Sequence, residues 1–335
     1  KNLMTKKNLV TVPDTVNRND AILALTRTRV EKLIVVDKKN RCVGLITVSD
    51  IEKSARNPEA TKDKEGRLRV AAAVGVGKDG IKRARALIEA GVDAIVVDTA
   101  HGHSKGVLDT IREIKKTFKS VDIIGGNVAT KEGALALIKA GVDAVKIGIG
   151  PGSICTTRIV AGVGIPQLTS VMNCAEIANK LNRQIISDGG IKFSGDIAKA
   201  LAAGADAVMI GSLFAGTVET PGKLIKKYGK LYKNFRGMGS VGAMNKGSAD
   251  RYFQKKQRDT SKYVSEGVEG LVKFKGNVDK IIYKLIGGLK SSMGYLGSKK
   301  VINLRNKPNF VKITKAGFYE SMVHNIDEVK KDSKY

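Results

Sequence analysis

The chain has 335 residues, enough for one large domain and one small one, and its hydrophobic fraction of 42% can supply a buried core. No apolar run reaches the roughly 18 residues that a membrane helix needs, so we expect no membrane partner. Lys and Arg number 59 against 32 Asp and Glu, a formal net charge of +27. The lysines are dispersed and aromatic residues make up only 5%. A Lys-rich proteome therefore explains this charge better than nucleic-acid binding does.

Residues 1–57 predict a small α/β unit. An amphipathic pattern over 21–30 indicates a helix, and apolar runs at 32–37 and 41–48 indicate two strands joined by a short polar turn. A second helix is expected to begin at Ser49-Asp50.

The polar stretch 58–67 predicts a linker, after which a second domain is expected to span 68–335. Its expected strands are 68–76, 94–99, 122–128, 144–150, 184–188 and 207–211. Its expected helices include 81–90, 106–118, 132–140 and 196–203. Repeated βα units indicate a parallel α/β sheet, either doubly wound or a barrel, and strands that end in glycine favour a (β/α)8 TIM barrel.

Three helices of this domain are followed by nearly the same sequence, Ala-Gly-Val-Asp-Ala at 90–94 and 140–144 and Ala-Gly-Ala-Asp-Ala at 203–207. We expect each glycine to end its helix in a left-handed cap, after which Asp-Ala enters the next strand. The regularity fails after Gly211. Residues 217–300 are rich in Gly, Lys and Ser, and so long a stretch without strong periodicity is usually functional or mobile.

The three cysteines, Cys42, Cys155 and Cys174, have no paired spacing, which indicates a reducing compartment such as the cytoplasm. Cys42 and Cys174 lie in apolar patterns and are expected in the core. Cys155 lies instead in the loop GIGPGSICTTR over 148–158, directly after a buried strand. Arg158 nearby would favour a thiolate, so Cys155 is a candidate nucleophile, the alternative being an incidental cysteine in an ordinary loop.

Two further strand ends have phosphate-site chemistry. Ser187-Asp188-Gly189-Gly190 leads to a helix that starts at Ser194, and Gly211-Ser212 ends the next strand. Backbone N–H groups at glycine turns and helix N-termini bind phosphate, and Asp188 is a candidate acceptor for ribose hydroxyls. The alternative for either site is a plain glycine turn.

The loop DTAHGHS over 98–104 follows another strand and has a His-x-His spacing that suggests a metal. No third ligand is apparent, so contact with substrate or cofactor is the favoured role. No G-x-G-x-x-G follows a strand, so any NAD must bind at the mouth of a barrel.

These motifs resemble the IMP dehydrogenase family over essentially the whole chain, although the cysteine loop is shared with GMP reductase. Three features favour the dehydrogenase: the Asp250-Arg251-Tyr252-Phe253 segment, the RGMGS motif at 236–240 and the N-terminal unit. That unit resembles one cystathionine-β-synthase-type (CBS) motif, with GLIT at 44–47 and Asp50. Such motifs usually act in pairs and bind purine nucleotides, and a single copy is visible here.

The resemblance implies a mechanism. Cys155 would attack C2 of the purine, a hydride would pass to NAD, and the resulting thioimidate would be hydrolysed to XMP. Arg251 and Tyr252 would lie on a mobile flap, over about 217–300, that enters the vacated nicotinamide site and activates water held by Thr157. Arginine is an awkward base, since its pKa normally exceeds about 12.

The resemblance also implies ligand sets. IMP contacts would be Ser153, Asp188, Gly190, Gly211, Ser212, Met238, Gly239 and Glu266, together with Phe235, which replaces the usual phosphate-binding Tyr. NAD contacts would be Asp98, Asn127, Gly148 and Gly150. K⁺ would bind carbonyls of Gly150, Gly152 and Cys155, completed in a homotetramer by a neighbouring subunit's Glu320, Ser321 and Met322, the last replacing a frequent His.

Alternatives are GMP reductase, a non-catalytic nucleotide-binding protein with the CBS unit as sensor, and a basic nucleic-acid binder. The six βα units are two short of a closed barrel. In the family, the CBS pair is inserted after the second barrel unit. We therefore expect the chain to lack the first two barrel units and the first CBS motif.

Overall fold

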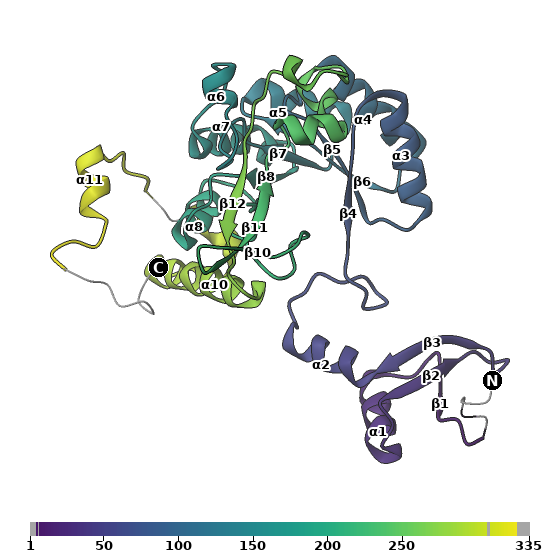
Figure 1. Cartoon of the computed structure of the whole chain (residues 1–335). Coiled ribbons are helices and arrows are strands. Elements are labelled where there is room, and N and C mark those ends of the chain that lie inside the picture. Colours follow the sequence, from purple (N-terminus) through teal and green to yellow (C-terminus); the bar gives the residue numbers. More distant parts are fainter. Residues whose placement is uncertain (1–4, 6, 307–308, 327–335) are drawn as a thin grey trace. The chain divides into compact units, whose positions relative to one another are not determined.

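The computed structural model describes residues 5, 7–306 and 309–326, and it divides the chain into two compact units, Lys1–Arg69 and Val70–Tyr335 (Figure 1). Among the described residues, none of the helices combines the length and the apolar character that crossing a bilayer requires.

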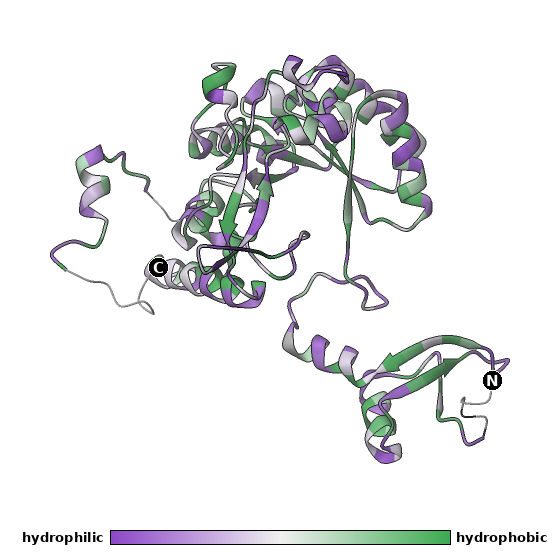
Figure 2. Ribbon diagram, viewed as in Figure 1, coloured by the Kyte–Doolittle hydropathy of each residue, from purple (hydrophilic) through white to green (hydrophobic). Residues whose placement is uncertain are grey.

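The first unit is a three-stranded sheet with two helices. The sheet has the order β1-β2-β3, with β1 parallel and β3 antiparallel to β2. The elements are β1 Thr11–Pro13, α1 Arg18–Thr28, β2 Lys32–Val36, β3 Cys42–Thr47 and α2 Val48–Arg56. Both predicted strands and both predicted helices are therefore present. Figure 2 shows β2 and β3 as mostly hydrophobic, as expected of strands that build a core.

Local hydrogen bonds explain this unit's turns. Asp37 accepts hydrogen bonds from the backbone N–H groups of Lys39 and Arg41, both at 2.9 Å, and Asn40 takes a left-handed φ of 59°, which closes the predicted hairpin. Thr47 and Asp50 form a reciprocal capping box that starts α2.

The expectation for the two structural cysteines is half right. Cys174, on α7 (Gln167–Lys180), is fully buried, and burial raises the pKa of its thiol to about 12. Cys42 is exposed, so its placement in the core was wrong. The reason is its position: Cys42 pairs with Val36 beside the bulge at the hairpin end of β3, outside the unit's apolar cluster around Leu33.

The second unit contains a parallel sheet of six strands in the order β4-β5-β6-β7-β8-β9. The strands are β4 Ala71–Val74, β5 Ala94–Asp98, β6 Asp122–Val128, β7 Ala144–Ile147, β8 Gln184–Asp188 and β9 Ala207–Met209. The helices that follow them are α3 Gly77–Glu89, α4 Lys105–Thr117, α5 Lys131–Ala140, α6 Thr157–Val160, α7 and α8 Ser194–Ala202. Because the strand order never reverses, the sheet is a half-barrel and the doubly wound alternative is wrong.

The repeated Gly-x-Asp-Ala sequences make the same connection three times. Each glycine has the predicted left-handed conformation, at Gly91, Gly141 and Gly204. Each aspartate accepts a hydrogen bond of 2.7–2.9 Å from a backbone N–H near the start of the preceding strand: Asp93 from Val70, Asp143 from Ile123 and Asp206 from Ile185. The aspartates thus fix the register of neighbouring strands.

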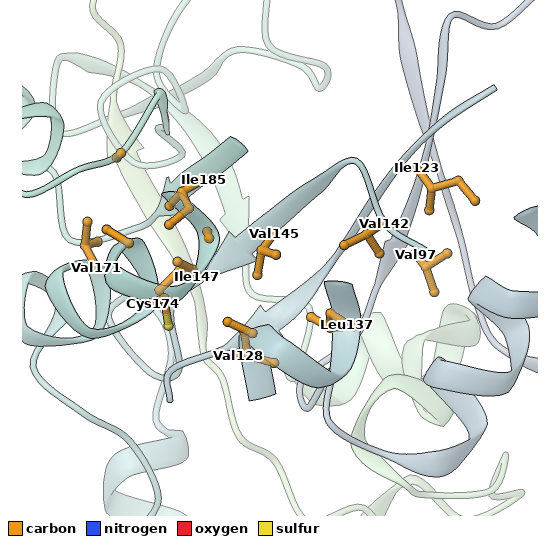
Figure 3. Close-up of a cluster of buried hydrophobic side chains, with 14 of the residues drawn as sticks. Val97, Ile123, Val128, Leu137, Val142, Val145, Ile147, Val171, Cys174 and Ile185 are labelled. Atoms are coloured by element: carbon orange, nitrogen blue, oxygen red, sulfur yellow. The ribbon is translucent and has the colours of Figure 1, made fainter. Parts of the chain in front are cut away.

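The core lies between this sheet and its helices (Figure 3). Ile123, Val145 and Ile185 from the strands meet Leu137 of α5 and Val171 of α7, all fully buried. The helices cover the outer face of the sheet, and a functional site is therefore expected at the carboxyl ends of the strands and the loops that follow them.

The stretch 217–300 is more ordered than expected. It holds an antiparallel sheet of β10 Ile225–Lys227, β11 Lys230–Arg236 and β12 Glu269–Lys273. It also holds the 18-residue helix α10, Val278–Tyr295. The expectation of an irregular stretch is wrong for these parts. Two central glycines weaken the helical pattern of α10, and one of them, Gly288, is needed because a Cβ there would lie 2.1 Å from Ser194 Oγ on α8.

Candidate active site

A cavity of about 330 Å³ lies at the carboxyl ends of β5, β7 and β8 and is closed by residues from the segments around β11 and β12. Its wall includes the residues predicted as catalytic, Cys155, Thr157, Arg251 and Tyr252. It includes the predicted cofactor contacts, Asp98, Asn127, Gly148 and Gly150. Of the predicted substrate contacts it includes Asp188, Gly211, Phe235, Met238, Gly239 and Glu266. The fold thus gathers residues from positions 98 to 267 around one space.

Three other predicted substrate contacts, Ser153, Gly190 and Ser212, do not line this cavity. Gly190 borders a smaller neighbouring cavity of about 100 Å³ with Asp196 and Lys199. Gly189 and Gly190 both have left-handed φ values, of 89° and 81°, so the turn after β8 has the glycine conformation expected of a phosphate loop.

Cys155 heads a chain of hydrogen bonds. Its Sγ lies 3.3 Å from Thr157 Oγ1, which donates to Glu266 Oε2 at 2.7 Å. The backbone holds this arrangement, because Thr156 N–H donates to the Glu266 carbonyl at 2.9 Å and Cys155 bridges to Gly267. The thiol is therefore connected through one hydroxyl to a carboxylate, which can take up a proton.

Arg158 holds the cysteine loop through backbone carbonyls. Its Nε donates to the Ile149 carbonyl at 3.2 Å and its Nη2 to the Ile165 carbonyl at 2.6 Å. A Cβ at Gly150 or Gly164 would lie within 2.6 Å of the Arg158 side chain, so both glycines make room for it. Arg158 thus shapes the loop that carries Cys155.

A second group centres on Asp98 at the end of β5. Arg251 contacts both carboxylate oxygens of Asp98, with Nη1 2.7 Å from Oδ2 and Nη2 3.0 Å from Oδ1. Lys146 Nζ also lies 3.0 Å from Oδ1. Lys146 also pairs with Asp188. Burial alone would raise the pKa of Asp98, but Lys146 and Arg251 outweigh burial and lower it. Asp98 is therefore an anion held by two cations.

Arg251 itself is a firm cation in this arrangement. Burial would lower the pKa of its guanidinium, but the hydrogen bonds and charge of Asp98 raise it. Its neighbour Tyr252 is also partly buried, and burial raises the pKa of that phenol. Gly239 packs against the Tyr252 ring, where a Cβ would lie 2.8 Å from Cζ.

Lys146 was missed by the sequence analysis. It is 2% exposed, although it lies inside the otherwise apolar strand β7. That placement was the available signal, since a lysine is almost never fully buried unless it is paired. Its partners were not visible from sequence because they come from β5 and β8.

Asn127 connects the ends of three strands. Its Nδ2 donates to the Gly148 carbonyl at 2.8 Å and to Asp188 Oδ2 at 3.0 Å. Its Oδ1 is buried and accepts no hydrogen bond from the described residues. A buried acceptor without a donor is costly, so this atom suits a ligand that brings an N–H or O–H group.

The remaining residues that were considered as metal ligands do not line the 330 Å³ cavity. His101 and His103 are neighbours, with ring centroids 6.3 Å apart, and the described residues include no group of three or more side chains suited to a metal. Glu320 ends helix α11 (Lys315–Glu320), followed by Ser321 and Met322. None of these three lines the cavity, and the Met322 carbonyl lies 2.9 Å from His324 Nδ1.

Known proteins share this sequence and architecture. Residues 13–324 match the family model of the IMP dehydrogenase / GMP reductase domain. The chain is 58% identical over 324 residues to the inosine-5'-monophosphate dehydrogenase of Rhizobium tropici and 54% identical over 333 residues to that of Aquifex aeolicus. These matches cover 97% and 99% of the chain but 65% and 67% of the relatives, so the chain spans about two thirds of their length.

Among solved structures, a GMP reductase from Trypanosoma brucei in complex with guanosine 5'-monophosphate is similar, with a TM-score of 0.85 and 42% identity. The similarity covers 95% of the chain and 65% of that structure.

Proposed function

The chain belongs to the IMP dehydrogenase / GMP reductase family, and on this premise we propose that it oxidises IMP to XMP with Cys155 as nucleophile and NAD as hydride acceptor. The observation that carries the proposal is the Cys155–Thr157–Glu266 chain in the wall of a cavity large enough for a nucleotide.

The first step is attack of the Cys155 sulfur on C2 of the purine. Thr157 and Glu266 offer a path for the thiol proton, because the hydroxyl contacts both groups. The chemistry that bound NAD supplies is acceptance of the hydride from C2. The purine is then joined to Cys155 as a thioimidate, and addition of water to C2 breaks the C–S bond, giving XMP and the free thiol.

The NAD site would use Asp98, Asn127, Gly148 and Gly150. The unpartnered Asn127 Oδ1 supports this assignment, because a carboxamide N–H can donate to it. In the structure, Arg251 already donates a hydrogen bond to the Asp98 carboxylate. We therefore expect NAD and the Arg251 segment to bind Asp98 in turn, one leaving before the other binds.

Water activation is assigned to Thr157 and Glu266, with Arg251 and Tyr252 closing the site. With its pKa raised by Asp98, Arg251 is a poor base where it lies, and could serve as one only after leaving that carboxylate. Its closing role follows from the two-oxygen contact with Asp98, which holds the segment against the strand ends.

IMP would bind through the residues that the family resemblance names: Ser153, Asp188, Gly190, Gly211, Ser212, Phe235, Met238, Gly239 and Glu266. K⁺ would be held by the carbonyls of Gly150, Gly152 and Cys155 together with a neighbouring subunit's Glu320, Ser321 and Met322, in a cytoplasmic homotetramer. Oxygen donors suit this ion, although the Gly152 carbonyl already accepts one hydrogen bond from Cys155 N–H at 3.1 Å.

Two structural proposals go with this function. The six parallel strands would belong to a closed TIM barrel. The N-terminal unit would be one CBS motif and would bind a purine nucleotide, for which its β-hairpin and two helices provide the expected framework.

The discriminating experiment incubates the intact protein with IMP and NAD and follows NADH absorbance and XMP formation. The runner-up, GMP reduction, is favoured by the likeness to the trypanosomal reductase, and it predicts NADPH consumption and ammonia release with GMP instead. IMP binding without turnover in either assay would support a non-catalytic nucleotide-binding protein. Light scattering and a comparison of K⁺ with Na⁺ test the tetramer and the ion.

A further inference from the structure

Lys233 is a buried cation outside the catalytic group. It lies on β11, is 3% exposed, and in the described part of the chain no carboxylate pairs with it. Its ammonium donates instead to three backbone carbonyls, those of Thr217 at 2.8 Å, Val218 at 3.2 Å and Thr220. We call these three carbonyls the cage of Lys233. An ammonium has three N–H donors, so the cage satisfies all of them.

The loop after β9 is folded so that its carbonyls face inward. Thr220 Oγ1 donates to the Phe214 carbonyl at 2.7 Å and lies 3.0 Å from Thr217 Oγ1. Val218 N–H donates to the Gly276 carbonyl at 3.0 Å, which ties the loop to the chain beyond β12. Burying a charge is costly unless it is well coordinated, so the loop and the ammonium each require the other.

The cage connects two walls of the proposed nucleotide site. The loop leads back to Gly211, and β11 leads on, two residues after Lys233, to Phe235; both line the 330 Å³ cavity. By family resemblance Gly211 is an IMP contact at a strand end with phosphate-site chemistry. Phe235 stands where the family usually has a phosphate-binding Tyr, whose hydroxyl contact it lacks. Without the ammonium, three carbonyls would face each other across a buried space, and the loop would move away from β11.

The geometry points to Lys233 as a positioning residue that holds the two halves of the phosphate site together. This inference rests on the proposed function. Lys233 does not touch the nucleotide; it acts through the loop between Gly211 and Thr220. Its cage has the ligand chemistry of a monovalent-cation site, with a tethered ammonium in place of a free ion.

The test compares Lys233→Met with Lys230→Met, a control that removes an exposed lysine from the same strand. Loss of a charged hydrogen-bonding group predicts IMP binding weakened about tenfold or more in Lys233→Met. Binding of inosine, which lacks the phosphate, should change much less, and Lys230→Met should match the wild type. Amides in 211–220 should exchange hydrogen faster in Lys233→Met. Equal weakening for IMP and inosine, or none for either, would overturn the positioning role.

Chemical rescue separates positioning from general stability. In Lys233→Ala, the vacated cage can accept a small alkylammonium, so propylammonium should restore IMP affinity and slow exchange in 211–220. Tetramethylammonium, which has no N–H donor, should do neither. If propylammonium and tetramethylammonium act alike, or if neither variant folds while wild type does, the inference is wrong. If the wild type fails to bind IMP, the proposed function fails, and the exchange and rescue measurements still decide the caging of the loop.

Discussion

A single buried ammonium, that of Lys146, holds together the two carboxylates around which the candidate site is built. Asp98 and Asp188 come from separate strands, and each would repel the other without the cation between them. Arg251 and Lys146 balance the two negative charges, so the group is neutral as a whole. This balance outweighs the burial of Asp98, whose pKa is lowered, so its carboxylate stays ionised.

We expect Lys146→Met to lower the free energy of unfolding by about 3 kcal/mol, because removing one partner of a buried ion pair leaves a carboxylate uncompensated. Chemical denaturation measures this directly. Lys139→Met, at an exposed position on α5, is the control and should have little effect. A Lys146→Met protein as stable as the wild type would show that water or a shift of Arg251 replaces the ammonium.

Cys155→Ser should abolish turnover while IMP still binds. A serine hydroxyl at its ordinary pKa is a far poorer nucleophile than a thiolate, and the substituted atom keeps its place beside Thr157. NADH formation and IMP titration give the two readings, with Cys42→Ser in the other unit as the control. Substantial NADH production by Cys155→Ser would remove Cys155 from the mechanism.

At the scale of elements, the segment between β11 and β12 carries Arg251 to the mouth of the half-barrel. We expect Arg251→Ala to slow hydrolysis more than hydride transfer, because the segment loses its contact with Asp98 while Cys155 is untouched. Stopped-flow mixing should show a burst of NADH followed by a slow phase, with purine trapped on the cysteine. Arg258→Ala, at an exposed position of the same segment, should behave as wild type. Equal slowing of both steps would mean that Arg251 is structural.

The contact between α8 and α10 depends on one of two adjacent glycines. A Cβ at Gly288 would lie 2.4 Å from Ser194 Cβ, whereas one at Gly287 would meet nothing within 4 Å. Gly288→Ala should therefore destabilise by about 1–3 kcal/mol through overpacking. Gly287→Ala should stabilise by up to about 1 kcal/mol, since alanine favours the helix. Thermal unfolding of both proteins checks the opposite signs, and equal shifts would show that the helices can move apart.

The parallel strands of the main sheet were predicted well from sequence, whereas β11, β12 and α10 were not. The parallel strands β5 to β8 are nearly continuous apolar runs, and Asp-Ala after a left-handed glycine marks where three strands of the sheet begin. β11 (KLYKNFR) and β12 (EGLVK) mix charged, polar and apolar residues without regular alternation, and α10 contains Gly287 and Gly288, so none of these patterns was strong. The polar partners of Lys146 and Lys233 come from other strands and loops, which a local pattern cannot show.

At the scale of the whole molecule, the chain comprises two compact units of unequal size. The larger unit holds every residue of the proposed catalytic cavity. Its sheet ends on β4 and β9, each of which pairs with one neighbour in the described part of the chain. The order of the strands follows the order of the sequence, so the repeated βα motif was enough to predict a parallel α/β sheet.

The three thiols give the molecule a set of built-in reporters. Cys42 lies exposed in the smaller unit, Cys155 lies half-buried in the cavity, and Cys174 is enclosed in the core with its pKa raised to about 12. An alkylating reagent should therefore label Cys42 at once whatever is bound, Cys155 at a rate that nucleotide suppresses, and Cys174 only when the larger unit unfolds. Mass spectrometry of one digest would then give three readings from the same sample. Labelling of Cys42 would report the reagent dose, labelling of Cys155 the nucleotide occupancy of the cavity, and labelling of Cys174 the unfolding of the larger unit. Labelling of Cys174 at the pace of Cys155 would contradict this ranking.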